Sequence, residues 1–255
     1  MPKIYNRMFY SDQVDGSSRS AQAVVPFILE LTHARSVIDV GCGLGTWLKA
    51  YAACGVDDYF GLDGAWVNPA SLQIPADRFR SVELSEAPLI TQRYDVAQSL
   101  EVAEHLPHTA AARFVDLLTG LSNVVVFSAA SPHQGGTHHI NEQWPEYWRE
   151  LFAARGYALH DVFRPRLWAN DNVEWWYAQN MFLYVKRGCA PALEAGVADA
   201  KGYKYPERVI HPKRIDPHYQ APLGLGGLMR SAPRLVASAW RQTFSRLPVR
   251  TLRSA

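Results

Sequence analysis

"SVIDVGCGLG", residues Ser36–Gly45, joins a short β-branched run to a loop with three glycines, and a segment with helical spacing follows. This order predicts a strand, a tight turn and the start of a helix. Glycine permits positive φ angles and lets a ligand approach the N–H groups at the helix N-terminus. A dinucleotide site would place its third glycine three positions after the second, whereas Gly45 follows Gly43 by two. Asp39, two residues before Gly41, suits a ligand with a positive ammonium end.

The chain on either side of this loop alternates apolar runs with helical patterns. Asn123–Ala129 is almost entirely apolar, as is typical of a strand covered on both faces. The alternation predicts an α/β fold: a doubly wound, Rossmann-like sheet of seven strands, mostly parallel, with an antiparallel last strand pair. The other expected strands are Asp58–Asp63, Phe79–Leu84, Tyr94–Leu100, Tyr157–Phe163 and Asn180–Lys186, with helices near 46–54, 112–121 and 144–155.

The composition is that of an ordinary globular protein. Of the 255 residues, 48% are apolar and 20% are charged, which is enough to bury a sizeable core. The three cysteines show no metal-type spacing and fit a reducing compartment. No apolar run has the length of a signal peptide core or a membrane span, so we expect a cytoplasmic protein.

The net charge of +2 hides an uneven distribution. From Lys201 onward the balance is +9, and residues 1–200 carry −7. We therefore expect three parts: an N-terminal cover segment (1–34), a main domain (35–188), and a basic extension punctuated by proline and glycine (189–255). The extension contains an expected amphipathic helix whose apolar face carries Met229, Val236, Trp240, Phe244 and Leu247.

The glycine loop resembles the first motif of class I methyltransferases that use S-adenosylmethionine (SAM). Two further segments match the order of that family. Asp63, eighteen residues after Gly45, is where the family's acid binds the ribose hydroxyls of SAM. Glu83 and Leu84 correspond to the acid and the following backbone N–H that contact adenine, although aspartate is more usual there. The resemblance spans residues 36–186 and implies that Asp39, Gly41, Gly43, Gly45, Asp63, Glu83, Leu84 and Ser99 bind SAM.

"SLEVAEHL", residues 99–106, raises a separate question, because it places Glu101, Glu104 and His105 in an apolar run. On one helical turn these side chains would converge, and two carboxylates repel unless a cation or proton lies between them. The spacing resembles the Glu-x-x-Glu-His metal site of ubiquinone-biosynthesis and small-RNA 2′-O-methyltransferases. The RNA enzymes add a histidine after the fifth strand, where this chain has His139, with His138 as a substitute.

The resemblance implies a metal held by Glu101, Glu104, His105 and His139, with Mn²⁺, Fe²⁺, Co²⁺ or Zn²⁺ favoured by the ligand type and Mg²⁺ by abundance. The ion would lower the pKa of an acceptor hydroxyl, giving Glu104, His105 and His139 catalytic roles. Two metal-free interpretations remain open. In one, His105 is a general base oriented by Glu104. In the other, Glu101 packs near the sulfonium while Glu104 and His105 begin a helix.

The acceptor side is expected in Arg164–Asn180, which joins the last two strands. Its aromatic residues could stack on sugars or pack against the sheet, and its arginines could meet acidic groups. Tyr5, Tyr10, Ser17 and Arg19 could cover the site from the N-terminal side. The residues in question in Arg164–Asn180 are Arg164, Arg166, Trp168, Trp175, Trp176 and Tyr177.

The Gly135–Gly136 pair departs from the RNA enzymes, and the main domain is more similar to uncharacterised bacterial methyltransferases of glycan-assembly gene sets. The resemblance implies an O-methyltransferase acting on a sugar hydroxyl of a surface glycan (polysaccharide or lipopolysaccharide) or its nucleotide-sugar precursor. Alternatives are an RNA ribose 2′-O-methyltransferase and a non-catalytic SAM-binding partner subunit. Residues 201–255 could contact the inner face of the membrane, a partner protein or nucleic acid.

Overall fold

The computed structural model describes residues 7–86, 88, 90–190, 193 and 208–215. The chain divides into two compact units, residues 1–211 and 212–255. Only the short helix α8 (Pro212–Ile215) is described in the second unit. The expected amphipathic helix between Met229 and Leu247 lies outside the described residues, as does Tyr5. Within the described ranges, no helix combines the length and apolarity that a membrane span requires.

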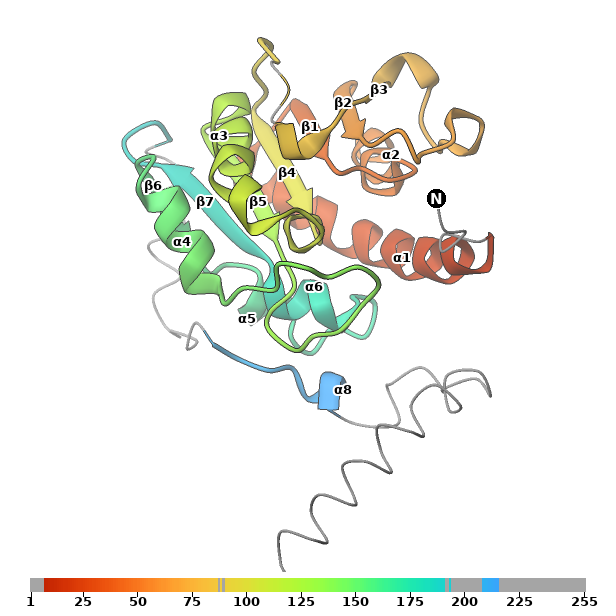
Figure 1. The fold of residues 1–255 in the computed structure, drawn as a ribbon. Coiled ribbons are helices and arrows are strands. Elements are labelled where there is room, and N and C mark those ends of the chain that lie inside the picture. Colours follow the sequence, from red (N-terminus) through yellow and green to blue (C-terminus); the bar gives the residue numbers. More distant parts are fainter. Residues whose placement is uncertain (1–6, 87, 89, 191–192, 194–207, 216–255) are drawn as a thin grey trace, which may run out of the picture. The chain divides into compact units, whose positions relative to one another are not determined.

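The first unit is built on a seven-stranded sheet in the order β3-β2-β1-β4-β5-β7-β6 (Figure 1). Every neighbouring pair from β3 to β5 is parallel, and β7 runs antiparallel to both β5 and β6. The predicted fold class is therefore confirmed. The strands are β1 (Ser36–Val40), β2 (Asp58–Asp63), β3 (Phe79–Ser81), β4 (Val96–Leu100), β5 (Val124–Ser128), β6 (Tyr157–His160) and β7 (Phe182–Lys186).

Both faces of the sheet are covered, which explains the nearly all-apolar sequence of β5. All residues of β4 and β5 are buried. One core lies between the sheet and α3 (Ala111–Leu121) with α4 (Pro145–Ala153), and the other lies under α1 (Arg7–Thr32) and α2 (Thr46–Ala53) (Figure 1). Residues on alternating sides of each strand enter one core or the other.

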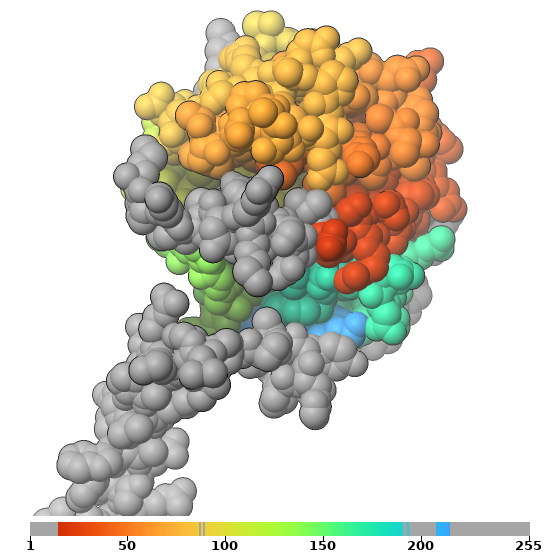
Figure 2. Space-filling view, turned by 90° about the vertical axis from the view of Figure 1, so that its right-hand side faces the viewer, coloured from red at the N-terminus to blue at the C-terminus, as the bar shows by residue number. Residues whose placement is uncertain are grey.

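Helix α1 forms the N-terminal cover segment and packs along the second core through Val24 and Ile28, both fully buried. It also lies against α6 (Trp175–Asn180), as Figure 2 shows for the red and teal segments. Ser17 Oγ and Tyr177 Oη are hydrogen-bonded at 3.1 Å. The Arg19 guanidinium pairs with Glu174 at 2.6 Å. These two residues of the cover segment therefore fix α6, and the side chain of Tyr10 is outside the described set.

Two predicted strands are shorter than expected. Phe79–Leu84 contains only the three residues of β3, because pairing with β2 ends at Asp63 and a 3₁₀ turn takes over at Leu84–Glu86. Tyr157–Phe163 ends as a strand at His160. The segment between the last two strands holds two short helices, α5 (Arg164–Leu167) and α6.

Candidate active site

The topology brings two loops of interest to the same edge of the sheet. β1 and β4 are parallel neighbours, yet the chain leaves β1 toward β2 and leaves β4 toward β5. A crevice forms outside the carboxyl ends of strands where the order reverses in this way, and ligands of doubly wound folds bind there. The glycine loop follows β1, and Glu101 follows β4, so both lie at this switch point.

The glycine loop has the backbone that its sequence predicts. Gly41, Gly43 and Gly45 have φ angles of 87°, 54° and 80°. A Cβ added at Gly41 would lie 2.3 Å from a methyl carbon of Val102, so the loop after β1 packs directly on the segment after β4. Asp63 Oδ2 accepts a hydrogen bond from the Gly43 N–H at 2.6 Å. The loop is thereby held in one conformation with its backbone at the crevice.

Two buried acids flank this loop. Burial raises the pKa of Asp39 to about 7, the Gln98 side chain lowers it, and the nearby Asp63 raises it further. Burial also raises the pKa of Asp63, although hydrogen bonds from Gly43 and Gly64 oppose that effect. Two carboxyl groups that burial makes costly to ionise are stabilised by a cationic ligand. The loop thus fits a cofactor that combines a positive charge with groups able to bind backbone N–H.

The other expected SAM contacts are placed as follows. Glu83 is exposed and accepts hydrogen bonds from Ser85 Oγ at 2.7 Å and from the Ser85 N–H at 3.2 Å. Leu84 is buried beside it. Ser99 is fully buried in β4, and its hydroxyl has no hydrogen-bond partner among the described residues.

Glu101 lies where β4 ends, in a backbone conformation that is rare for a side-chain-bearing residue, with φ of 54°. The spacing predicted one helical turn that carries Glu101, Glu104 and His105. This prediction is wrong for Glu101, because its φ angle is not helical. Two amides bind its carboxylate: Gln134 Nε2 donates at 2.8 Å and Asn180 Nδ2 at 3.2 Å. Burial raises the pKa of Glu101 to about 7, and these hydrogen bonds oppose the rise.

Glu104, His105 and His139, here called the Glu104 cluster, offer ligand atoms that all lie within 4.8 Å of one another. The rings of the two histidines are 4.8 Å apart and nearly perpendicular. Both carboxylate oxygens of Glu104 are buried without a hydrogen-bond partner among the described residues. Burial, and next the neighbouring Glu101, raise its pKa well above the usual value. A buried carboxyl group without a hydrogen-bond partner, close to two imidazoles, is an environment that a divalent cation stabilises.

Each imidazole of the Glu104 cluster is oriented through its Nδ1 atom. His105 Nδ1 lies 3.3 Å from the His138 carbonyl oxygen, which can only accept, so Nδ1 carries the proton. His139 Nδ1 lies 3.0 Å from Glu142 Oε1. Burial lowers the pKa of His105 to about 4, which leaves its ring neutral at pH 7. Hydrogen-bond partners of this kind orient metal-binding histidines and leave Nε2 to bind the metal.

The segment 131–143, called the histidine loop, is fixed to the 3₁₀ turn that carries Glu104. The N–H groups of Ile140 and Asn141 both donate to the Glu104 carbonyl oxygen, at 2.9 and 3.0 Å. This anchor places the side chain of His139 in the cluster. His138 has a φ of 60° and an exposed side chain, and it contributes its backbone carbonyl instead.

Sequence reasoning missed three polar residues of this region. Glu142 accepts the N–H groups of His133 and Gly135 in addition to His139 Nδ1. Gln134 and Asn180 bind Glu101 from two distant segments. No motif marks them, because glutamine, asparagine and glutamate are common in surface loops and only the fold gives them buried partners.

The side chains of Arg164–Asn180 that are candidates for the acceptor side make contacts within the protein. Arg164 is 1% exposed and is paired with Asp161 at 2.6 Å, so it does not present its charge to an acceptor. Arg166 stacks on the Phe27 ring of α1. Tyr177 is buried and pairs with Trp47, whereas Trp168 and Trp176 are half-buried, the first against His211 and the second against the α1 core.

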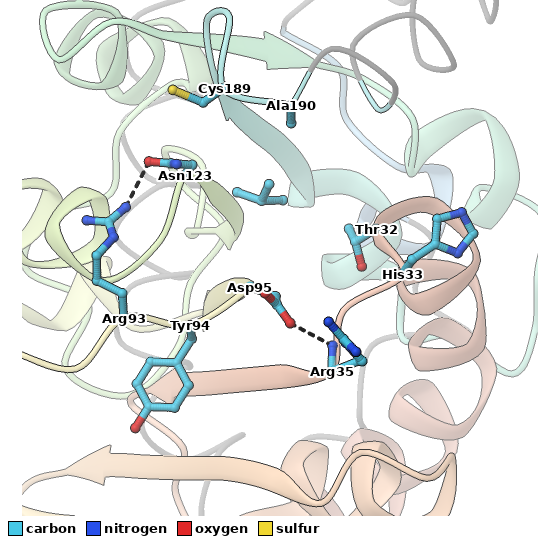
Figure 3. Close-up of a pocket in the computed structure, with 10 residues that line it drawn as sticks. Thr32, His33, Arg35, Arg93, Tyr94, Asp95, Asn123, Cys189 and Ala190 are labelled. Carbon is cyan, nitrogen blue, oxygen red and sulfur yellow. Dashed lines mark hydrogen bonds between the residues drawn. The ribbon is translucent and has the colours of Figure 1, made fainter.

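A separate cavity of about 300 Å³ lies at the amino ends of β1, β4 and β5 (Figure 3). Asp95 accepts the Arg35 N–H there, and the Arg93 guanidinium donates to Asn123. This cavity is at the sheet edge opposite to the switch point and contains none of the predicted site residues.

Known structures with this fold resemble the chain at low sequence identity. The magnesium protoporphyrin IX methyltransferase of Synechocystis is 17% identical with a TM-score of 0.52, covering 73% of this chain and 90% of its own. The amino pentose methyltransferase CalS10 of Micromonospora echinaspora is 15% identical with a TM-score of 0.52, covering 73% and 99%. A putative O-methyltransferase of Nostoc punctiforme is 14% identical with a TM-score of 0.51, covering 70% and 59%. These likenesses show the fold.

No curated protein matches the sequence. A family model described as a methyltransferase domain matches residues 13–189. The matched range contains the glycine loop, both of its acids and the whole Glu104 cluster, and it covers more than two thirds of the sequence. The chain therefore belongs to this methyltransferase family and is a class I enzyme that uses S-adenosylmethionine as its methyl donor.

Proposed function

We propose that this enzyme is an O-methyltransferase in which the Glu104 cluster holds a divalent metal ion beside the SAM site. The observation that carries the proposal is the buried Glu104 carboxyl group, which has no hydrogen-bond partner among the described residues and lies within 4.8 Å of a ring nitrogen of each of two oriented imidazoles. Leaving such a group unpaired in the interior is costly. A bound cation would remove that cost, and Glu101 would add negative charge next to it.

The donor set indicates which ions fit. One carboxylate and two imidazole nitrogens favour Mn²⁺, Fe²⁺, Co²⁺ or Zn²⁺, since Mg²⁺ prefers oxygen ligands. A bound divalent ion lowers the pKa of a hydroxyl group that coordinates to it. Residues of the protein orient the two imidazole rings and bind the methyl donor. Glu142 and the His138 carbonyl orient the two rings, and Asp39 with the glycine loop binds the donor.

Both substrates would meet at the switch point. The glycine loop and the Glu104 turn lie on the neighbouring strands β1 and β4, so a donor on one and an acceptor on the other share one crevice. Methyl transfer requires the attacking oxygen about 3–3.5 Å from the methyl carbon, with the oxygen deprotonated. The positive charge of the donor is lost in this step, so the site mainly has to align the two groups and take up a proton.

The proposed acceptor is a sugar hydroxyl with a second hydroxyl beside it, in a surface glycan or its nucleotide-sugar precursor. Two neighbouring hydroxyls would both be available to an ion held by the Glu104 cluster, whereas an isolated amine would offer a single ligand atom. The resemblance of the main domain to methyltransferases of glycan-assembly gene sets supports this class. Such precursors are assembled at the inner face of the membrane, so we propose that the enzyme acts in the cytoplasm and contacts that surface through residues 201–255.

A methyl-transfer assay with nucleotide sugars and glycan fragments, with and without EDTA, tests this function. Glu104→Ala and His139→Ala should each lower turnover on the order of 100-fold, as EDTA should. His138→Ala is the matched control, because its side chain is exposed and only its backbone oxygen contacts His105. Normal turnover in EDTA and in both variants would refute the metal-dependent mechanism.

One observation favours a second acceptor class. The balance of +9 from Lys201 onward would suit an RNA phosphate backbone, and the enzyme would then methylate a ribose 2′-hydroxyl. RNA binding should in that case weaken steeply with salt and with removal of residues 216–255. Donor binding that is indifferent to metal, with no transfer to any sugar or RNA, would instead indicate a non-catalytic SAM-binding subunit.

A further inference from the structure

Residues 208–211, called the strap, belong to the basic extension in the sequence and to the catalytic unit in the structure. At one end, Arg208 pairs with Glu146 at 2.6 Å and lies over the Trp144 ring. At the other end, His211 is 4% exposed, its ring lies 4.5 Å from Trp168, and its Nε2 lies 2.8 Å from the Trp168 carbonyl oxygen. The strap therefore joins the start of α4 to the α5–α6 segment.

A chain of side-chain amides runs from the strap to Glu101. The His211 N–H donates to Gln179 Oε1 at 2.7 Å. Gln179 Nε2 then donates to Asn180 Oδ1 at 2.9 Å. Asn180 Nδ2 donates to Glu101 Oε1 at 3.2 Å and to Gln134 Oε1 at 2.8 Å. Gln134 Nε2 completes the set by donating to Glu101 Oε2 at 2.8 Å.

The direction of this chain follows from its first member. A backbone N–H can only donate, so it requires the Gln179 oxygen to face His211 and its nitrogen to face Asn180. The Asn180 oxygen must then face Gln179, which turns its nitrogen toward Glu101. Every donor consequently points toward the carboxylate, and hydrogen bonds aligned in one direction strengthen one another. The Ser131 N–H gives Gln134 a second, longer anchor at 3.3 Å.

We propose that the strap is a positioning element of the active site, which holds the Glu101 carboxylate in place through Gln179 and Asn180. Residues 208–211, which the sequence assigns to the extension, would then be part of the active-site structure of the catalytic domain. Gln179 Nε2 also donates to Ser131 Oγ at 3.0 Å, at the start of the histidine loop. In the hydrogen bonds of the described residues, His211 and Gln179 touch neither the Glu104 cluster nor the glycine loop, so they act through Asn180 and Ser131. The kinetic consequence of this inference rests on the proposed function, whereas the structural consequence does not.

The test uses three full-length variants. His211→Ala removes the ring that fastens the strap to Trp168. Gln179→Glu keeps the acceptor for the His211 N–H but replaces the donor to Asn180 with an oxygen. Arg155→Ala is the control for a general loss of stability. It removes the 2.6 Å ion pair between Arg155, which follows α4, and Asp116 of α3, away from the amide chain.

Hydrogen exchange of the protein alone, measured on peptides covering 99–106 and 175–181, reports whether Glu101 and α6 are held by the strap. His211→Ala and Gln179→Glu, the two site variants, should exchange faster in these peptides. Arg155→Ala should not, even if it lowers the melting temperature. Turnover should fall about 10-fold in His211→Ala and Gln179→Glu with the KM for SAM unchanged, as for residues that orient the groups surrounding a metal site. Should His211→Ala fail to fold, Arg208→Ala loosens the other, exposed end of the strap.

Unchanged exchange in both peptides for both site variants would overturn the proposal, whatever the activity. Faster exchange with unchanged turnover would overturn the positioning role. The exchange measurement needs no substrate or metal. If the wild-type enzyme were inactive on sugars, that result would count against the proposed function, and the exchange data would still test the proposal about the strap.

Discussion

Gly136 has no side chain because the ring of His139 occupies the space beside its α-carbon. A Cβ there would lie 2.3 Å from His139 Nε2, and the φ angle is 141°. Gly135 also has a positive φ, 73°, but faces open space. The glycine pair that departs from the RNA enzymes therefore has two different tasks: one residue turns the chain, and the other admits the imidazole.

Gly136→Ala should displace the His139 ring and weaken metal binding and turnover by about 10- to 100-fold. Gly135→Ala should cost about 1 kcal/mol of stability through backbone strain and leave metal binding intact. Titration of both variants with Mn²⁺, together with thermal unfolding, separates the two effects. Equal metal affinities in the two variants would contradict the assigned position of His139.

Asp39 should make the stability of the ligand-free enzyme depend on pH. Its pKa is 3.8 in an ordinary environment and about 7 in the folded protein, so between these values the folded state binds the extra proton. Stability therefore falls as pH rises through this window, by about 4 kcal/mol in full. Asp39→Asn removes this titrating group. The free energy of unfolding of the variant, relative to that of the wild type, should therefore be higher at about pH 8 than at about pH 5. Urea unfolding at both pH values measures the difference, and parallel pH profiles would refute the raised pKa.

At the scale of elements, the histidine loop depends on one side chain that binds three donors. Glu142 receives two backbone N–H groups and His139 Nδ1, and it thereby sets the shape of the loop and the orientation of one ring together. The loop is rich in glycine and lacks regular structure, so it has no ladder of backbone hydrogen bonds to replace this support.

Glu142→Ala should therefore weaken metal binding about 10- to 100-fold, while SAM affinity stays near the wild-type value, because the glycine loop is held separately by Asp63. Glu150→Ala, on the exposed side of α4, is the control for loss of a glutamate. Calorimetric titration with metal and with SAM measures both affinities. An equal loss of affinity for the two ligands would show general unfolding of the site instead.

The strands and the glycine loop could be predicted because their causes are local. The all-apolar sequence Val124–Phe127 predicts the buried strand β5, and the glycines after β1 predict a turn that needs positive φ angles. The arrangement of Glu101 could not be predicted, since its φ of 54° and its amide partners come from packing between distant segments. The choice between His138 and His139 depends on two hydrogen bonds to the Glu104 carbonyl, which spacing does not reveal.

At the scale of the whole molecule, the proposed ion should act as a stabilising ligand. The folded chain buries both oxygens of Glu104 without a partner among the described residues, and the unfolded chain leaves them in water. A cation that binds only the folded state stabilises it by about 2.7 kcal/mol at a concentration of 100 times Kd. Thermal unfolding of EDTA-treated enzyme should thus shift upward on addition of Mn²⁺. Glu104→Ala should abolish the shift, and a shift of equal size in that variant would place the ion elsewhere.

The reversal of β7 determines which part of the site the connection before it can affect. Because β7 runs opposite to β5, the segment that enters it, which includes Asn180 at the end of α6, lies at the rim where the parallel strands end. Changes in the connection that precedes β7 would therefore act directly on the rim that holds Glu101, and would reach the donor side only through the contact of Tyr177 with Trp47.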